Sequence, residues 1–328
     1  MSSGSIPGAP HDSAVSVVVP VFNSYRSLPE LAERVAQALT PVTRAYELVF
    51  VDDGSRDTSW DVIMKLARED RRVHGLVLSR NFGQHNALLA GIRAANYEIV
   101  VTMDDDLQHR PEEIPRLLAE LTQDVDLVYG TPVEEEHGFW RSFCSRSVKA
   151  ALATSLGASN ARSISAFRAF RTSLRDGFMT DDAFPSIDVL LSWTTTRTTQ
   201  IGVEMDDRKY GRSHYNFRRL VRHSLNMVTG YSTGPLRLVT LVGFAFAFFG
   251  LGLFLFVIVR WFIFGSTVAG FTFLAAIISS FSGAQMLAIG ILGEYVGRIH
   301  FRSMRRPMFL VRTTTDEQEL NNPTDETA

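Results

Sequence analysis

Two long apolar stretches near the C-terminus constrain the fold of this chain more than any other feature. They cover residues 238–259 and 271–293, and neither contains a charged residue. Each approaches the length of roughly 20 residues that a helix needs to cross a bilayer. Because only a short segment joins them, we expect a tight helical hairpin. The sequence therefore predicts a water-facing domain attached to a membrane, and a substrate that resides in that membrane.

Basic residues surround the two stretches, whereas the segment between them carries only Arg260, at its edge. The basic residues before the first stretch are Arg208, Lys209, Arg212, Arg218, Arg219, Arg222 and Arg237, and those after the second are Arg298, Arg302, Arg305, Arg306 and Arg312. The positive-inside rule then predicts a multi-pass protein of the cell membrane with its main domain and both termini in the cytoplasm. The alternative, a pair of buried core helices, fits the missing charges and the paired basic flanks poorly.

Composition excludes several classes of protein. The net charge of −2 gives no general argument for nucleic-acid binding. The single cysteine, Cys144, excludes an intramolecular disulfide and fits a reducing compartment. No charged-then-apolar segment opens the chain, so we expect no signal peptide.

The first half of the chain alternates short apolar runs with helical patterns. The predicted strands are 15–19, 48–51, 73–78, 99–103 and 125–129, and the predicted helices are 27–39, 60–68, 87–95 and 112–121. A capping box is expected where Ser27 precedes Glu30. This alternation predicts an α/β fold with a mostly parallel sheet covered on both faces, and sites in such sheets lie at the carboxyl ends of the strands.

The remaining segments complete the predicted organisation. Within the main domain we expect a helix at 140–156 and strands at 166–170 and 200–205. The predicted parts of the chain are a disordered N-terminus at 1–13, a main domain at 14–216, a juxtamembrane amphipathic helix at 217–235, transmembrane helices at 236–264 and 270–296, and a cytoplasmic basic flank with a disordered tail at 297–328.

The densest chemical signal is the run Asp104-Asp105-Asp106-Leu107-Gln108 directly after a predicted strand. Neighbouring carboxylates repel one another unless a cation lies between them. Oxygen ligands from Asp104, Asp106 and Gln108 suit Mg²⁺ or Mn²⁺, which would bind the diphosphate of a nucleotide donor. The alternative is a solvated acidic turn that caps the next helix.

Three weaker clusters accompany this run. Val51-Asp52-Asp53-Gly54-Ser55 either contacts a base or ribose or forms a plain turn and N-cap. The segment 80–86, which opens with Arg80, either lines a nucleotide pocket or caps a helix. The basic segment 208–215 suits phosphate binding and also fits a positive-inside flank.

In this order, the clusters resemble the membrane-anchored polyprenyl-phosphate glycosyltransferases of glycosyltransferase family 2. The resemblance covers roughly residues 14–310. Within the family it is strongest to the bacterial two-span undecaprenyl-phosphate sugar transferases, in particular those for 4-deoxy-4-formamido-L-arabinose and for glucose. The hairpin flanks 233–237 and 292–298 also resemble that subgroup.

The resemblance implies a GT-A fold, Mg²⁺ or Mn²⁺ as cofactor, and roles for particular residues. The implied metal ligands are Asp104, Asp106 and Gln108. The implied nucleotide-sugar contacts are Pro20, Phe22, Asn23, Asp53, Arg80, Asp104 and Asp105. The implied catalytic residues are Asp106, Arg208 and Ser213, and weaker assignments for the acceptor phosphate are Arg141 and Arg146. His214 stands where the family usually has Lys.

The implied reaction is inverting transfer of a sugar from a nucleotide sugar, with UDP expected, to a membrane polyprenyl phosphate. The implied partners are those two substrates, the membrane, further copies of the chain in a tetramer, and a downstream flippase and membrane glycosyltransferase. No nucleic-acid partner is expected. Two alternatives stay open: a processive polysaccharide synthase, whose Gln-x-x-Arg-Trp motif is missing from this sequence, and a non-catalytic membrane scaffold.

Overall fold

The computed structural model describes residues 13–133, 165–178, 187–206, 234–264, 270–304 and 307–321. The predicted helix at 140–156 and residues 217–233 of the predicted helix at 217–235 lie outside these residues. The chain divides into two compact units: one holds the sheet and the residues from 307 onward, and the other holds the two long C-terminal helices.

The first unit is built on an eight-stranded sheet in the order β7-β5-β6-β4-β1-β2-β3-β8. Its strands are β1 (Ala14–Val21), β2 (Ala45–Asp52), β3 (Val73–Leu78), β4 (Ile99–Thr102), β5 (Leu127–Pro132), β6 (Arg168–Arg171), β7 (Thr198–Val203) and β8 (Val311–Thr314). β1 pairs in parallel with both β2 and β4, and β2 with β3, whereas β6 and β8 run antiparallel to their neighbours. The predicted strands are confirmed within a few residues, and the sheet is mixed where β6 and β8 join it.

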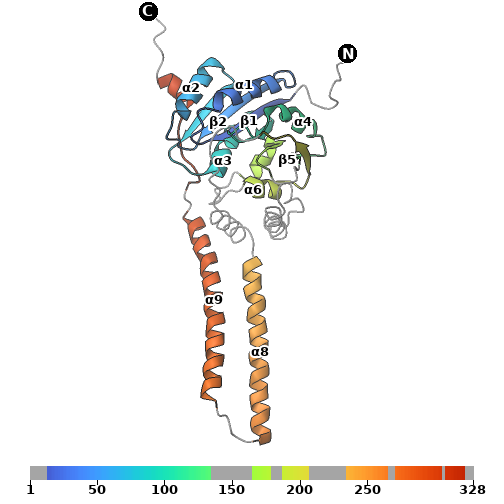
Figure 1. Ribbon diagram of the computed structural model, residues 1–328, viewed down its shortest axis with the longest axis vertical. Helices are drawn as coiled ribbons and strands as arrows, with labels where there is room; N and C mark the ends of the chain where they lie inside the picture. Colours follow the sequence, from blue (N-terminus) through green and yellow to red (C-terminus); the bar gives the residue numbers. More distant parts are fainter. Residues whose placement is uncertain are drawn as a thin grey trace, which may run out of the picture. The chain divides into compact units, whose positions relative to one another are not determined.

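Helices cover both faces of this sheet (Figure 1). They are α1 (Leu28–Leu39), α2 (Ser59–Glu69), α3 (Gln84–Ala94), η1 (Pro111–Glu113), α4 (Ile114–Ala119), η3 (Thr172–Phe178), α6 (Ile187–Thr194) and α10 (Thr315–Asn321). The expected capping box is wrong, because Ser27 makes no side-chain cap hydrogen bond at the start of α1. Its hydroxyl donates instead to the Ser24 carbonyl, a local bond that competes with capping.

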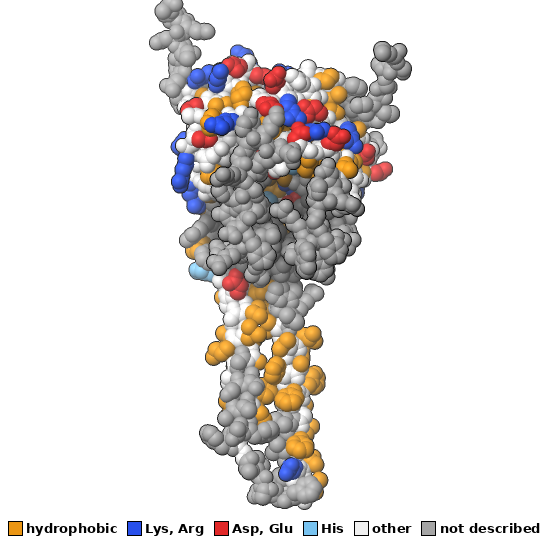
Figure 2. Space-filling view, in the orientation of Figure 1, with side chains coloured by type: hydrophobic (Ala, Val, Ile, Leu, Met, Phe, Trp, Pro, Cys, Tyr) orange, Lys and Arg blue, Asp and Glu red, His pale blue; other side chains and the backbone are white. Residues whose placement is uncertain are grey.

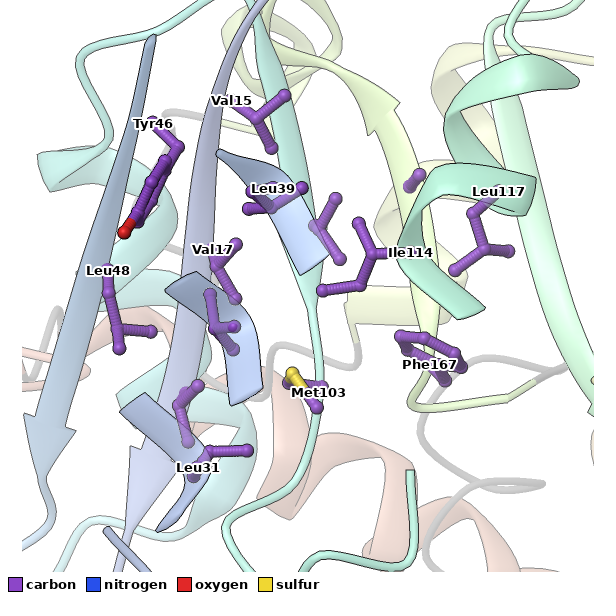
Figure 3. Close-up of a cluster of buried hydrophobic side chains, with 14 of the residues drawn as sticks. Val15, Val17, Leu31, Leu39, Tyr46, Leu48, Met103, Ile114, Leu117 and Phe167 are labelled. Carbon is purple, nitrogen blue, oxygen red and sulfur yellow. The ribbon is translucent and has the colours of Figure 1, made fainter. Parts of the chain in front are cut away.

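Alternating side chains of the central strands build two apolar cores. Val17 of β1 and Leu48 of β2 face α1, α2 and α4, whereas Val18 and Val49 face α3 and α6. Figure 3 shows the first core, where residues of α1 and α4 meet those of β1 and β2. Every residue of β1 is buried on one face or the other, so the strand is a nearly continuous apolar run, interrupted by Ser16, rather than an alternating one.

The prediction of a disordered C-terminal tail is wrong for residues 311–321, which form a strand and a helix. Residues of β8 pair with the open edge of β3, and α10 follows directly. The Thr315 hydroxyl accepts a hydrogen bond from the Gly75 peptide N–H at 3.1 Å, and Gln318 accepts one from the Trp60 indole at 3.0 Å. Backbone pairing needs no apolar sequence, so hydropathy alone did not reveal this strand.

The second unit contains α8 (Gly234–Phe264) and α9 (Phe271–Ser303). α9 therefore ends beyond the predicted bound of residue 296. The two helices touch through the rings of Phe246 and Phe281, whose centroids lie 5.5 Å apart edge to face. Large apolar side chains stand exposed along both helices, as Figure 2 shows: examples are Leu241, Phe248, Phe262, Met286 and Leu287.

In the part of the chain that the structure describes, no helix combines the length and the apolar character that a membrane crossing requires.

Thr315→Val is expected to lower the free energy of unfolding by about 1–3 kcal/mol, because the buried Gly75 N–H would lose its acceptor while the side-chain shape is kept. Urea unfolding followed by circular dichroism measures the change. Thr58→Val is the control, since Thr58 is exposed and makes no cap hydrogen bond. Equal stability of the two variants would contradict the role given to Thr315.

Candidate active site

One cavity lies at the carboxyl ends of the four central parallel strands. It has a volume of about 340 Å³ and is lined by the last residues of β1 and by residues that follow β1, β2, β3 and β4. These residues are Pro20, Val21, Phe22, Asp53, Asn81, Gly83, Gln84, Asp104, Asp105 and Asp106. β1 stands between β2 and β4, so the strand order reverses beside it, and this is the usual place for a ligand in an open α/β sheet.

Asp53 holds the loop after β3 in place beside the cavity. Its carboxylate oxygens accept hydrogen bonds from the peptide N–H groups of Phe82, at 2.6 Å, and of Gly83, at 2.8 Å. Burial raises the pKa of Asp53, and these two hydrogen bonds oppose that shift. A base-binding role for Asp53 remains a prediction, and its structural role is to join two pocket loops.

Gly54 allows the same two loops to approach each other. Its φ of +70° lies in the left-handed region, and a Cβ there would meet the Arg80 carbonyl carbon at 2.7 Å. The turn that the sequence offered as one alternative is therefore confirmed, and this close approach requires glycine. The guanidinium of Arg80 lies 4.4 Å from the ring centre of Phe82, and Arg80 itself does not line the cavity.

The segment after β3 both lines the cavity and begins a helix, and its predicted contact with a nucleotide stays a prediction. Asn81, Gly83 and Gln84 line the cavity, and α3 begins at Gln84 with Gly83 as its N-cap. The Gln84 amide donates to Asp104 Oδ1 at 2.6 Å. The sequence analysis included Gln84 in this segment but assigned a contact only to Arg80.

Asn23 connects the loops after β1 and β2 instead of lining the cavity. Its N–H donates to the Ser55 hydroxyl at 2.9 Å, and its side-chain oxygen accepts from the Arg56 N–H at 2.8 Å. Pro20 and Phe22, the other residues expected from β1, do line the cavity.

The three carboxylates after β4 differ in environment. Asp105 accepts a hydrogen bond from the Phe22 N–H at 3.2 Å. Burial raises its pKa to about 6, while the bonds from Ser24 and Phe22 oppose the shift. Asp106 Oδ1 accepts from the Gln108 N–H at 3.1 Å. Asp105 thus ties the acidic segment to the end of β1, and Asp104 and Asp106 stand on either side of it.

The donor set fits a hard divalent cation shared with a substrate. Asp104 and Asp106 offer oxygen atoms to one cavity, and Mg²⁺ is commonly held by one or two carboxylates together with substrate phosphates and water. Among the described residues, no group of three or more His, Cys, Asp or Glu side chains is placed to hold a metal. Gln108 is not among the residues that line the cavity, and its role as a ligand stays a prediction.

The remaining predicted site residues lie outside the described part of the chain. They are Arg141, Arg146, Arg208, Ser213 and His214. The third described stretch, residues 187–206, ends at Asp206. The Asp206 N–H donates to the Gln108 carbonyl at 2.9 Å, and its carboxylate pairs with Arg34 and Arg110. The last described residue before the basic segment is therefore held at the end of the acidic one.

Comparisons with known proteins agree with the expected family. Residues 16–174 match the model of glycosyl transferase family 2. The undecaprenyl-phosphate 4-deoxy-4-formamido-L-arabinose transferase of Proteus mirabilis is 36% identical over 95% of this chain and 97% of its own length. The enzyme of the same name from Pseudomonas aeruginosa strain LESB58 is 38% identical over 90% of this chain and 89% of its own.

Among solved structures, glucosyl-3-phosphoglycerate synthase from Mycobacterium tuberculosis, in complex with Mn²⁺, UDP and glucosyl-3-phosphoglycerate, matches with a TM-score of 0.49. The sequence identity is 18%, over 66% of this chain and 78% of that one.

Asp53→Asn is expected to loosen the loop after β3, because an amide cannot accept hydrogen bonds through both of its terminal atoms. Amide hydrogen exchange over residues 80–86 should become at least roughly tenfold faster, which corresponds to the loss of about one charge-assisted hydrogen bond. Asp61→Asn, on the exposed face of α2, is the control. Unchanged exchange in the Asp53 variant would refute this anchoring role.

Proposed function

The chain belongs to glycosyl transferase family 2 and is a glycosyltransferase, and we propose that it transfers a sugar from a UDP-sugar to a polyprenyl phosphate in a membrane. The observation that carries this proposal is the acidic cavity at the ends of β1 to β4. The names of the relatives, which match along nearly the whole chain, support undecaprenyl phosphate as the acceptor.

In the proposed reaction an oxygen of the acceptor phosphate attacks the anomeric carbon of the donor. The bond between that carbon and the diphosphate oxygen breaks, UDP leaves, and the configuration at the carbon is inverted. A phosphate monoester has a second pKa near 6, so the acceptor is largely ionised at pH 7. The enzyme then needs no strong general base, and its contribution is positioning and charge stabilisation.

We assign the binding of donor, metal and acceptor to different residues. Asp53 and Phe22 would bind the nucleoside, and Asp104 and Asp106 would hold Mg²⁺ or Mn²⁺ against the diphosphate. The metal would supply positive charge to the leaving group. Arg208 and Ser213 would contact the diphosphate, and Arg141 and Arg146 would bind the acceptor phosphate.

We also propose a location and partners for the enzyme. The uncharged sequence of the C-terminal stretches and the exposed apolar side chains of α8 and α9 support a membrane hairpin with the catalytic unit in the cytoplasm. Association into a tetramer, and use of the product by a flippase and a membrane glycosyltransferase, follow from the resemblance alone. Because the chain is an enzyme, the scaffold alternative is set aside.

Asp106→Asn is expected to reduce sugar transfer at least roughly 100-fold, because it removes a negative charge while keeping the oxygen that accepts the Gln108 N–H. The assay combines the purified protein in detergent with undecaprenyl phosphate, Mn²⁺ and a panel of labelled UDP-sugars, and measures labelled lipid. Asp124→Asn, at an exposed position away from the cavity, is the control. Full activity of the Asp106 variant, or activity in EDTA, would contradict the assigned metal site.

The full chain is expected to stay with membranes after washing with 1 M salt and then with alkaline carbonate. Salt screens electrostatic attraction to the lipid surface, so retention would reflect apolar insertion. Immunoblots of the pellet and supernatant measure the distribution. Release by carbonate would refute the membrane hairpin without affecting the assignment of the cavity.

A further inference from the structure

The acidic segment after β4 is closed by a side chain to which the proposed function gives no role. The Asp104 N–H donates a hydrogen bond to His109 Nδ1 at 3.0 Å. Leu107, with φ of +63°, reverses the chain between these two residues. The chain therefore folds back so that His109, directly after the acidic run, accepts a hydrogen bond from the peptide of Asp104.

The imidazole is held firmly in this orientation. Only 7% of His109 is exposed, and its ring stacks on Phe167 with 5.2 Å between the ring centres and 17° between the planes. The backbone of His109 also forms an antiparallel bridge with Met205. Phe167 is fully buried just before β6, so the ring rests on the sheet itself.

The hydrogen bond fixes which nitrogen carries the proton. A peptide N–H can only donate, so Nδ1 must present a lone pair and the proton of the neutral ring must be on Nε2.

We propose that His109 is a positioning residue whose Nδ1 lone pair fixes the Asp104 peptide and thereby the directions of the Asp104 and Asp106 carboxylates in the cavity. This inference rests on the proposed function, which gives those carboxylates a metal and a nucleotide diphosphate to bind. Removing a residue that hydrogen-bonds to a metal ligand and orients it typically lowers metal affinity by about 10- to 100-fold.

A purely space-filling role for His109 is the competing explanation, and two amide substitutions separate the two. Asn places its side-chain oxygen close to the position of Nδ1, whereas Gln carries its amide to the region of Nε2. Both substitutions remove the ring that stacks on Phe167. Only His109→Asn keeps an acceptor for the Asp104 N–H.

The experiment measures Mn²⁺-dependent UDP binding by calorimetry for the full chain in detergent. We expect His109→Asn to bind within about threefold of the unmodified protein and His109→Gln to bind at least roughly tenfold more weakly. Amide exchange over residues 99–110, without ligand, should be faster in the Gln variant than in the Asn variant. Urea unfolding should show both variants destabilised by the lost stacking, and the Gln variant more so, because it also leaves the Asp104 N–H without an acceptor.

The outcomes separate this inference from the proposed function. Equal binding and equal exchange in the Asn and Gln variants would overturn the positioning role, while UDP binding by the unmodified protein would leave the proposed function standing. Absence of Mn²⁺-dependent UDP binding in the unmodified protein would overturn the proposed function and this inference with it. If the Gln variant does not fold, a tenfold loss of binding in the Asn variant overturns the inference.

Discussion

The parallel pairing of β1 with β2 on one side and with β4 on the other determines where the chemistry of this protein lies. Val21 pairs with Asp52, and Val18 pairs with Thr102, so the residues that follow all three strands emerge at one edge. The fully buried side chains of β1 hold it at the centre of the sheet. Because a shift of one residue would exchange the faces of a strand, the two apolar cores strongly specify this register. The acidic cavity is a consequence of that register.

Given the register, hydrogen bonds between loops shape the cavity. Asp53 accepts from the loop after β3, Asp105 accepts from the end of β1, and Gln84 donates to Asp104. Asp53, Asp104 and Asp105 are thus each engaged by a neighbouring loop, which offsets part of the cost of gathering like charges. The carboxylates that would bind the nucleotide sugar also hold the loops together. A substitution at one of them is therefore expected to change both ligand binding and the local stability of the loops.

The sequence predicted the central strands well because their apolar runs are short, continuous and separated by helical patterns. It also placed Asp53 and the Asp104–Asp106 run correctly at the sheet edge, since parallel strands present their carboxyl ends together. It missed β8 because Thr313 and Thr314 join the sheet through their backbone. It did not predict a role for His109, because a single histidine forms no sequence motif. The position of its ring depends on the chain reversal at Leu107 and on the contact with Phe167.

The return of the chain to β3 has a consequence for folding. Gly75 and Thr315 are 240 residues apart in sequence, and the segment that forms α8 and α9 lies between them. Until β8 is made, the edge of β3 presents unpaired N–H and C=O groups, which are a template for incorrect pairing. The entropic cost of closing so long a connection grows only slowly with its length, so the great length of the connection adds little to the free-energy cost of pairing β8 with β3. Because Leu310 also accepts a hydrogen bond from Ser79, directly before the loop after β3, the last strand completes a sheet edge that borders the cavity.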